Sequence, residues 1–546
     1  MRSVVDAPQA RVVPVAPDLI ERVVDATKRV VESHRATWQV WHVRSEAERQ
    51  IRAQAPAGAD VDALVEDVIG AVLHPDRSIP LGGDDPVPVP ALLRRRDGVS
   101  VYEVAGSRLY TSATVLADEA FLLESAGRRD GRAASDVDVE VALVESVANG
   151  VTLNTAQAHL VRAMATSGAR VQLAIAPAGS GKTTAMAALT TAWTGAGGTV
   201  IGLAPSAVAA GILAQESGAT AETLAKLTFG ISAGLLPDWA EKVDEATLFI
   251  VDEAGMASTG DLAAVTRFAL GRGASVRLVG DDRQLASIAA GGVLRDIQAS
   301  EGAVTLSELI RFRDPAEGAA SLAIRCGDSA GIGFYIDRGR VHVGDLTTVT
   351  DHAYTAWAAD RAAGLDSIML APTRDLATEL NVRARTDRLT RLPTGDDQTA
   401  PRTRRPSREV GLVDGSSASA GDLVITRRNA RRLKTTATDF VKNGDRWTVT
   451  QARRDGRLDV VHTRTGRHLT LPAQYVREHV QLGYATTVHG GQGVTCDSSH
   501  TVATGAESRQ QLYVAVTRAG TLTTCTWPPL ATATSIPSSP PPRPTR

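Results

Sequence analysis

The sequence predicts an α/β fold in which parallel sheets are flanked by helices, and three observations predict it. Short apolar runs, such as Val171–Ile175 and Leu248–Val251, stop at glycines or acids and are followed by helical patterns. The same alternation of strand and helix patterns begins again near Arg340. Between residues 420 and 475, short strand patterns alternate with turns, including the tight-turn dipeptide Asn443-Gly444, and indicate a small inserted β-barrel.

The composition restricts the possible classes of function. The 546 residues suffice for three or four domains of ordinary size. The 59 basic and 61 acidic residues give a formal net charge of -2, so any surface that attracts nucleic acid must be local. The three cysteines form no CxxC pair, which argues against a zinc site or disulfides and fits a reducing compartment. No run is long enough for a signal peptide or a membrane span, which predicts a cytoplasmic protein without membrane insertion.

The first part of the chain is predicted to be mainly helical. Apolar residues recur at helical spacing between Asp18 and Ala53 and again from Val61 to Leu73. Trp38 and Trp41 could form a base-stacking platform, but core residues three apart on one helix face are the favoured interpretation. The stretch from residue 75 to 90 is rich in proline, glycine and aspartate, which is typical of a linker.

A glycine-rich turn follows the apolar run at Val171 and predicts a triphosphate site. The turn, APAGSGKTT, opens an alanine-rich helical pattern, so its backbone N–H groups would meet phosphate at a helix N-terminus. Lys182 would contact the β- and γ-phosphates of ATP, and the hydroxyl of Thr183 would bind Mg²⁺. Ala176 stands where this pattern usually begins with glycine. A chance glycine turn is the alternative, against which the flanking strand and helix argue. The predicted nucleotide-binding residues are Gln157, Ala178, Gly179, Ser180, Gly181, Lys182, Thr183 and Thr184.

Two adjacent acids end the apolar run at Leu248–Val251. Ligands of open α/β sheets lie at the carboxyl ends of the strands, so Asp252 and Glu253 are expected to face the same site as Lys182. Asp252 would hold Mg²⁺, and Glu253 would polarise the water that attacks the γ-phosphorus. A pair of acids after a strand is also a common helix cap, but the glycine-rich turn about seventy residues earlier favours catalysis.

Three further side chains are candidates for the same site. Gln284 follows a third strand pattern, SVRLVGDDRQL, and is placed to contact the γ-phosphate. Gln157, on a short helix before the glycine-rich turn, can offer a donor and an acceptor to adenine. Arg311, in the segment LSELIRFRDP with Arg313, either stabilises transferring phosphate or forms a surface salt bridge, and both interpretations stay open.

The predicted barrel carries a basic stretch that would make a local nucleic-acid surface in a chain of near-zero net charge. It consists of Arg427, Arg428, Arg431, Arg432 and Lys434. A second basic and proline-rich segment, residues 390 to 407, is a solvated loop or a further contact to a phosphate backbone.

Taken in order, these stretches resemble the motif series of the superfamily 1 helicases in the RecD/TraA-like branch. Gln157 matches the Q motif, APAGSGKTT motif I, APSAVAA motif Ia, VDEAGM motif II, VGDDRQL motif III, YATTVHGGQGVT motif V and YVAVTR motif VI. Seven motifs in order are far more specific than any single one. Segments such as WQVWHVR, RFRDPAEGAASLA and FVKNGDRWTV resemble, more narrowly, the helicase half of actinobacterial conjugative relaxases of the TrwC/TraI (MobF) type.

The resemblance implies two RecA-like domains with ATP and Mg²⁺ in the cleft between them, an SH3-like barrel in the second domain, and 5′-to-3′ translocation on single-stranded DNA. It also implies that Arg518 and Arg311 cross the cleft to the γ-phosphate. Thr487, His489 and Gln492 would couple the DNA track to the nucleotide. Relaxosome or other conjugation-machinery proteins are the implied partners.

The implied division of the chain has eight parts. They are a helical N-terminal region (1–74), a linker (75–98), an accessory α+β segment (99–150), the first RecA-like domain with Walker A and B (151–325), the first part of the second RecA-like domain (326–420), the SH3-like insertion (421–476), the second part of that domain with motifs V and VI (477–527), and a disordered tail (528–546).

Three features depart from the pattern of these relatives. Gly490-Gly491 in motif V would loosen the loop that couples DNA to ATP. The relaxase domain, with its histidine triad and catalytic tyrosines, does not precede the helicase motifs. After Arg518 the sequence TLTTCTWPPL runs into a Pro/Ser-rich tail, which suggests a truncated end and puts the closing strand of the second domain in question.

Two alternative functions follow from these departures. The first is a truncated relic that binds ATP and DNA without unwinding, and the second is a RecD-like subunit of an exonuclease complex. A P-loop protein of unrelated purpose, such as a kinase, would leave motifs III, V and VI together unexplained.

Overall fold

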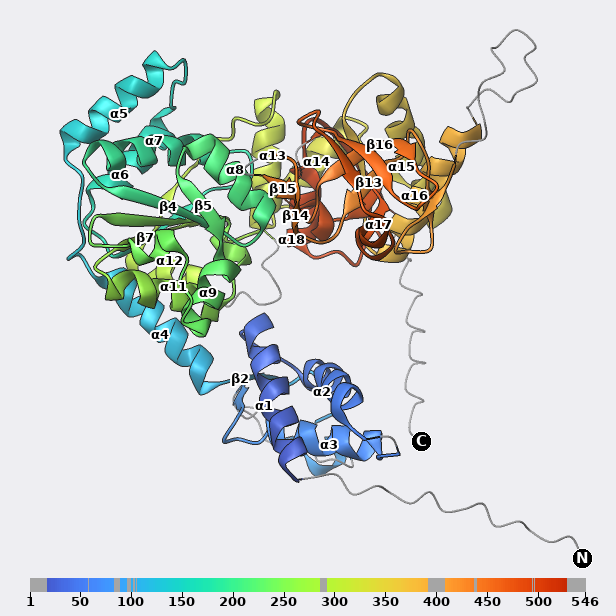
Figure 1. The fold of residues 1–546 in the computed structure, drawn as a ribbon, viewed down its shortest axis with the longest axis horizontal. Helices are drawn as coiled ribbons and strands as arrows, with labels where there is room; N and C mark the ends of the chain where they lie inside the picture. The colour runs from blue at the N-terminus through green and yellow to red at the C-terminus, as the bar shows by residue number, and fades with distance from the viewer. Residues whose placement is uncertain are drawn as a thin grey trace, which may run out of the picture.

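The computed structural model describes residues 17–527 apart from 57, 83–88, 96–99, 102, 103, 105, 285–291, 391–407, 437, 438, 493 and 495. Figure 1 shows two α/β lobes side by side and a separate helical module that adjoins the first lobe through one long helix. Among the described residues, no helix has the length and apolar character that crossing a membrane requires. The predictions for the basic loop at 390–407 and for the tail at 528–546 fall almost entirely outside the described residues.

The N-terminal module packs three helices and a short strand pair around one apolar core. Trp38 is fully buried in that core, whereas Trp41 is 54% exposed. The prediction that the two rings share one helix face is wrong, because Trp38 precedes the helix and pairs its backbone with Tyr110 instead. One strand lies within the stretch predicted as a linker. The elements are α1 (Pro17–His34), α2 (Val40–Gln54), α3 (Val61–Val72), β1 (Ile79–Leu81), η1 (Ala91–Leu93) and β2 (Leu109–Thr111).

The first lobe is a six-stranded sheet, in the order β5-β4-β6-β7-β3-β8, in which every neighbouring pair is parallel. Its central strands β6 and β7 are buried along their whole length, as the apolar run of β6 requires, and β7 buries Arg277 as well. The strands are β3 (Val171–Ile175), β4 (Thr199–Ala204), β5 (Thr220–Thr223), β6 (Thr247–Val251), β7 (Ser275–Gly280) and β8 (Val304–Thr305).

Helices cover both faces of this sheet, with separate apolar clusters on the two sides. The helix α4 leads from the N-terminal module and packs against α11 and α12 (Figure 1). The helices are α4 (Ala113–Gly127), α5 (Asp136–Ala148), α6 (Thr155–Thr166), α7 (Lys182–Gly195), α8 (Ala207–Ser217), α9 (Leu224–Ala233), α10 (Asp238–Glu241), η2 (Ala254–Met256), α11 (Thr259–Gly271) and α12 (Val293–Glu301).

The second lobe is a five-stranded parallel sheet in the order β20-β10-β21-β22-β9. The strand β22 pairs with both β21 and β9, so the suspicion that the closing strand is lost is wrong. The elements are α13 (Pro315–Cys326), α14 (Ala330–Asp337), β9 (Val341–Val343), α15 (Leu346–Ala362), β10 (Ser367–Ala371), α16 (Arg374–Thr390), β20 (Ala485–Thr487), η3 (His489–Gly491), β21 (Cys496–Val502), α18 (Arg509–Val516) and β22 (Ala519–Trp527).

An antiparallel insertion lies between α16 and β20. Its five-stranded sheet runs in the order β18-β17-β16-β13-β19. Trp447 of the insertion and Leu380 of the second lobe belong to one continuous apolar core. The elements are β11 (Val410–Gly411), β12 (Ser417–Ala418), β13 (Leu423–Thr426), β14 (Ala430–Lys434), β15 (Phe440–Val441), β16 (Arg446–Ala452), β17 (Leu458–His462), β18 (His468–Leu471), α17 (Ala473–His479) and β19 (Val480–Leu482).

The predicted fold class is therefore confirmed: two parallel α/β lobes, an inserted antiparallel sheet and a mainly helical N-terminal region. The exact domain limits stay predictions. The insertion sheet takes its last strand, β19, from beyond the predicted limit at residue 476.

Candidate nucleotide site between the lobes

The phosphate loop joins β3 to α7 in the first lobe. Gly179 and Gly181 have φ angles of 86° and 73°, which L side chains rarely adopt. A Cβ at Gly181 would lie 2.2 Å from Nε2 of Gln157, and one at Gly179 would lie 2.6 Å from Cβ of Arg311. Neighbouring side chains thus close around a loop that only glycine can form at these two positions.

Ala176 is compatible with this loop despite the usual glycine there. Its N–H donates to the carbonyl oxygen of Gly280 at 2.8 Å, and its side chain is 3% exposed. Among the described non-glycine residues only Glu253 has a positive φ, so Ala176 occupies a conformation that tolerates a Cβ. The first glycine of the pattern is therefore dispensable in this chain.

The hydrogen-bond donors of the loop itself fit a triphosphate. The hydroxyl of Ser180 is buried and has no hydrogen-bond partner among the described residues. Thr183 and Thr184 are half-buried at the start of α7, where backbone N–H groups lack helical partners. Ala178 is buried at the base of the loop. Within the described residues, no group of three histidines, cysteines, aspartates or glutamates could hold a metal ion. A Mg²⁺ ion would therefore depend on Thr183, Asp252 and the phosphates themselves.

Lys182 brings the two predicted acids together. Its Nζ lies 2.7 Å from Oδ1 of Asp252 and 2.8 Å from Oε1 of Glu253. Burial opposes the charge of Lys182, but the two carboxylates outweigh it and raise the pKa of Lys182 above its ordinary value. Lys182 also holds the pKa of Glu253 below its usual value, whereas burial raises the pKa of Asp252. Glu253 is thus the carboxylate that stays ionised most readily.

Glu253 has an unusual backbone. Its φ of 50° lies in the left-handed region, where residues other than glycine and asparagine are uncommon. The N–H of Glu253 donates to Oδ1 of Asp252 at 2.9 Å, which stabilises the turn locally. Such strain is typical of residues that a functional site holds in one orientation.

Two predicted arginines come near Glu253 from opposite sides of the cleft. Arg311 follows the first sheet, and its Nη1 donates to the carbonyl oxygen of Thr517 at 2.6 Å. Arg518 follows α18 of the second lobe, is 3% exposed, and donates from Nε to Val514 at 2.9 Å. The charge of Lys182 is the main cause that lowers the pKa of Glu253, and the two guanidinium groups lower this pKa further. Burial lowers the pKa of Arg518 to about 10, and Arg311 contributes.

The two predicted glutamines have different surroundings. Nε2 of Gln157 donates to the carbonyl oxygens of Ser180 and Gly181 at 3.3 and 3.1 Å, and Oε1 accepts from the N–H of Asn154 at 3.0 Å. This amide therefore supports the loop directly, and its contact with adenine stays a prediction. Gln284 follows β7, with its N–H directed at the carbonyl oxygen of Asp281 at 3.4 Å. Its contact with phosphate stays a prediction as well.

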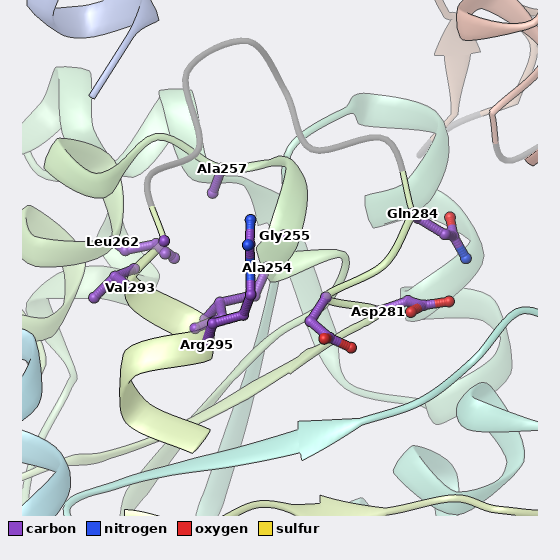
Figure 2. A pocket seen from close by; sticks show the side chains of 11 residues that line it. Ala254, Gly255, Ala257, Leu262, Asp281, Gln284, Val293 and Arg295 are labelled. Carbon is purple, nitrogen blue, oxygen red and sulfur yellow. The ribbon is translucent and has the colours of Figure 1, made fainter. Parts of the chain in front are cut away.

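A small pocket lies beside the turn that follows Asp252. In Figure 2 the side chains of Asp281 and Gln284 point away from Leu262 and Val293 on the opposite wall. Neither Lys182 nor either acid of the site lines this pocket, whereas Gln284 does. The pocket therefore shares only Gln284 with the predicted site residues.

Motif V forms a tight turn after β20. Oγ1 of Thr487 accepts the N–H of Gly490 at 3.1 Å, and the turn continues through His489 as η3. A Cβ at Gly490 would lie 2.5 Å from Oγ1 of Thr486, and one at Gly491 would lie 2.9 Å from Leu370. Both glycines thus allow close packing in this turn, and the expected loosening of the loop stays a prediction. The coupling role of Thr487, His489 and Gln492 stays a prediction.

The basic stretch of the insertion is not one uniform cluster. Nε of Arg427 donates to Gln481 at 2.7 Å, and Nη1 of Arg428 lies 3.1 Å from Nε2 of His479. Arg431 pairs across the lobes with Glu222 at 3.2 Å and stacks on Phe440. Arg432 is exposed on β14. One member of the predicted DNA surface thus also connects the insertion to the first lobe.

The sequence reasoning missed Tyr513, Asp281 and Arg325 at the lobe boundary. The hydroxyl of Tyr513 donates to Oδ2 of Asp281 at 2.9 Å and accepts the N–H of Ala178 at 3.1 Å. Arg325 donates to the other oxygen of Asp281 at 2.9 Å. The sequence feature that could have pointed to Tyr513 is its position on the short helix α18, which leads to Arg518.

Comparisons with known proteins agree with these motifs. A family model described as an AAA domain matches residues 152–346. The conjugal transfer protein TraA of Agrobacterium fabrum is 30% identical over 354 residues, which cover 64% of this chain and 30% of that protein. The probable conjugal transfer protein TraA of Sinorhizobium fredii is 30% identical over 359 residues, which cover 64% of this chain and 30% of that protein. The chain thus spans under a third of the length of these relatives.

Among solved structures, the Pif1 helicase from Bacteroides in complex with ADP-AlF3 and ssDNA aligns with a TM-score of 0.41 and 19% identity. The alignment covers 65% of this chain and 88% of that one. The matches in sequence, together with the seven ordered motifs, confirm that the chain resembles the superfamily 1 helicases of the TraA/RecD-like branch.

Proposed function

We propose that the chain is an ATP-dependent motor that translocates 5′ to 3′ on single-stranded DNA and unwinds duplex DNA. One observation carries the proposal. Lys182 and Glu253 of the first lobe lie in ion-pair contact, and Arg311, which packs against Gly179 of the phosphate loop, donates to the carbonyl oxygen of Thr517, the residue before Arg518 of the second lobe. A phosphate bound there would contact both lobes, so its loss on hydrolysis would change their attraction.

The roles of the residues follow from their chemistry. The loop N–H groups and Lys182 would bind the β- and γ-phosphates, and Thr183 and Asp252 would hold Mg²⁺. The ion would supply charge neutralisation for the phosphates. Glu253, kept ionised by Lys182, would orient the attacking water and accept its proton. Arg518 and Arg311 would stabilise the charge that develops on the transferring phosphoryl group.

The relatives of the chain suggest a setting for this motor, which we propose as part of the same function. Both are conjugal transfer proteins. The chain would then act in the cytoplasm on the strand transferred from a plasmid or other mobile element, with relaxosome proteins as partners. The strand β22, which pairs with both β21 and β9, argues against the alternative of a truncated relic.

Strand displacement on duplexes with a single-stranded tail tests the proposed function. We expect ATP-dependent unwinding of the duplex with a 5′ tail and none of the duplex with a 3′ tail. Unwinding from the 3′ tail alone would contradict the proposed polarity. ATP turnover that rises with DNA but releases no strand would favour a translocase or relic over a helicase.

Charge reversal at Arg432 tests the DNA surface. Arg432 is exposed, so Arg432→Glu should weaken binding to single-stranded DNA and reduce the slope of log K against log salt by about one unit or more. Arg272→Glu, an exposed substitution at the C-terminal end of α11 in the first lobe, is the matched control. Salt titration of a fluorescent oligonucleotide measures both variants. An unchanged slope for Arg432→Glu would place the strand elsewhere.

A further inference from the structure

Helix α18 meets the first lobe through a fully buried tyrosine. Figure 1 shows α13, α14 and α18 on the side of the second lobe that faces the first. Tyr513 of α18 is 0% exposed, and its hydroxyl bonds to the phosphate loop at Ala178 and to the end of β7 at Asp281. Burial raises the pKa of Tyr513, so the hydroxyl stays protonated and remains a donor to Asp281. A single second-lobe atom thus contacts two first-lobe segments.

Asp281 is held by the second lobe at both of its oxygens. Arg325 on α13 donates to Oδ1, while Tyr513 donates to Oδ2. The helices α13 and α18 pack against each other, so these two donors belong to one layer. Asp281 is 5% exposed, and a buried carboxylate that loses such a donor is costly. Separation of the lobes at this point would therefore carry a free-energy penalty.

The phosphate loop also packs into the second lobe at this point. Ala178 belongs to an apolar cluster with Ile324, Tyr335 and Val516. The N–H of Ala178 is a donor of the loop itself, one residue before Gly179. A shift of α18 relative to β7 must therefore alter the hydrogen bond at the base of the phosphate loop.

We propose that Tyr513 is a positioning residue that transmits the relative position of the two lobes to the phosphate loop, and thereby couples DNA binding to ATP turnover. The inference rests on the proposed function. The same α18 leads to Arg518, whose charge reaches Glu253. The helix α18 would thus determine the positions of both Arg518 and the phosphate loop. The hydroxyl of Tyr513 would make these two parts move together.

The test compares Tyr513→Phe with Tyr354→Phe. Each variant removes one buried hydroxyl, and Tyr354 packs against Trp357 on α15, away from the cleft. Coupling between sites commonly amounts to roughly 5–150-fold, and we expect Tyr513→Phe to lower the stimulation of kcat by single-stranded DNA about tenfold. The readout is the ratio of kcat with DNA to kcat without DNA, and the KM for ATP is measured separately, because the Tyr513 hydroxyl also contacts the phosphate loop. Tyr354→Phe should leave the stimulation unchanged.

An unaltered stimulation in Tyr513→Phe, or an equal loss in Tyr354→Phe, would overturn the inference. An equal fall in turnover with and without DNA, which leaves the ratio unchanged, would indicate a local structural role instead and would overturn the inference as well. Wild-type protein that hydrolyses ATP without stimulation by DNA would refute the proposed function.

Hydrogen exchange distinguishes a failure of this inference from a failure of the proposed function, because it needs no ATP turnover. In the wild type, a non-hydrolysable ATP analogue should slow exchange both in the phosphate loop and in α18. In Tyr513→Phe it should slow exchange in the loop alone. Protection of α18 that persists in this variant would contradict the role of Tyr513, whatever the effect of DNA. An analogue that protects neither segment of the wild type would refute both proposals.

Discussion

Substitution of Lys182 by alanine is expected to abolish ATP turnover. The variant lacks the cation that would contact the β- and γ-phosphates. The substitution also removes an ion pair from the protein without nucleotide. Asp252 and Glu253 both pair with Lys182, so the variant leaves two adjacent carboxylates without their cation. Removing one partner of a buried ion pair costs up to roughly 3–5 kcal/mol, and Lys182→Ala should therefore also lower the melting temperature at neutral pH. ATPase assay and thermal unfolding measure the two effects.

Lys182→Arg is the matched control for this effect on stability. Arginine keeps the charge between the two acids but replaces a compact ammonium with a planar guanidinium. This variant should unfold closer to the wild-type temperature and still hydrolyse ATP poorly. Wild-type turnover in Lys182→Ala would rule out the assignment of the phosphate-binding lysine. A melting temperature unchanged in Lys182→Ala would show that the two acids do not need the ion pair.

Substitution of Glu253 by glutamine should separate nucleotide binding from hydrolysis. The amide keeps the shape of the side chain but cannot accept the proton of water, and loss of a general base costs about 10²–10⁴-fold in rate. The variant also removes a negative charge near Lys182, Arg311 and Arg518. We therefore expect single-turnover hydrolysis slower by at least about 10²-fold, with ATP bound as tightly as in the wild type or more tightly.

Glu46→Gln controls for loss of an arginine-paired carboxylate elsewhere. Glu46 lies in the N-terminal module, pairs with Arg49, and likewise has a pKa below its usual value although burial opposes this. The Glu46→Gln variant should hydrolyse ATP at the wild-type rate. If Glu253→Gln kept its hydrolysis rate, another group would have to accept the proton.

Much of the fold and of the site could be predicted because strong local patterns determine them. The apolar run before Asp252 had to be a buried strand, and β6 ends at Val251. The carboxyl ends of parallel strands meet at one edge of the sheet, which places Lys182 beside both acids. Likewise, the turn signal at Asn443-Gly444 lies between two strands of the insertion, β15 and β16.

The features that were missed depend on contacts between distant parts of the chain. Tyr513 and Ala178 are 335 positions apart in sequence, and nothing near either residue predicts their hydrogen bond. Arg431 and Glu222 are also remote, 209 positions apart, so a basic stretch that suggested DNA binding also connects the two lobes. The strand β22 was doubted because its flanking sequence resembles a tail, yet pairing on both sides supplies partners that its own residues do not reveal.

The continuous apolar core shared by the insertion and the second lobe limits how the proposed motor can move. Trp447 and Leu380 both belong to this core, so moving the insertion against its lobe would open a void, and we expect the insertion to move as a rigid arm of its lobe. A rotation of that lobe would carry the arm and the cleft arginine through one common displacement. The length of each step along a nucleic acid would then depend on the swing of the whole lobe and not on bending within the arm.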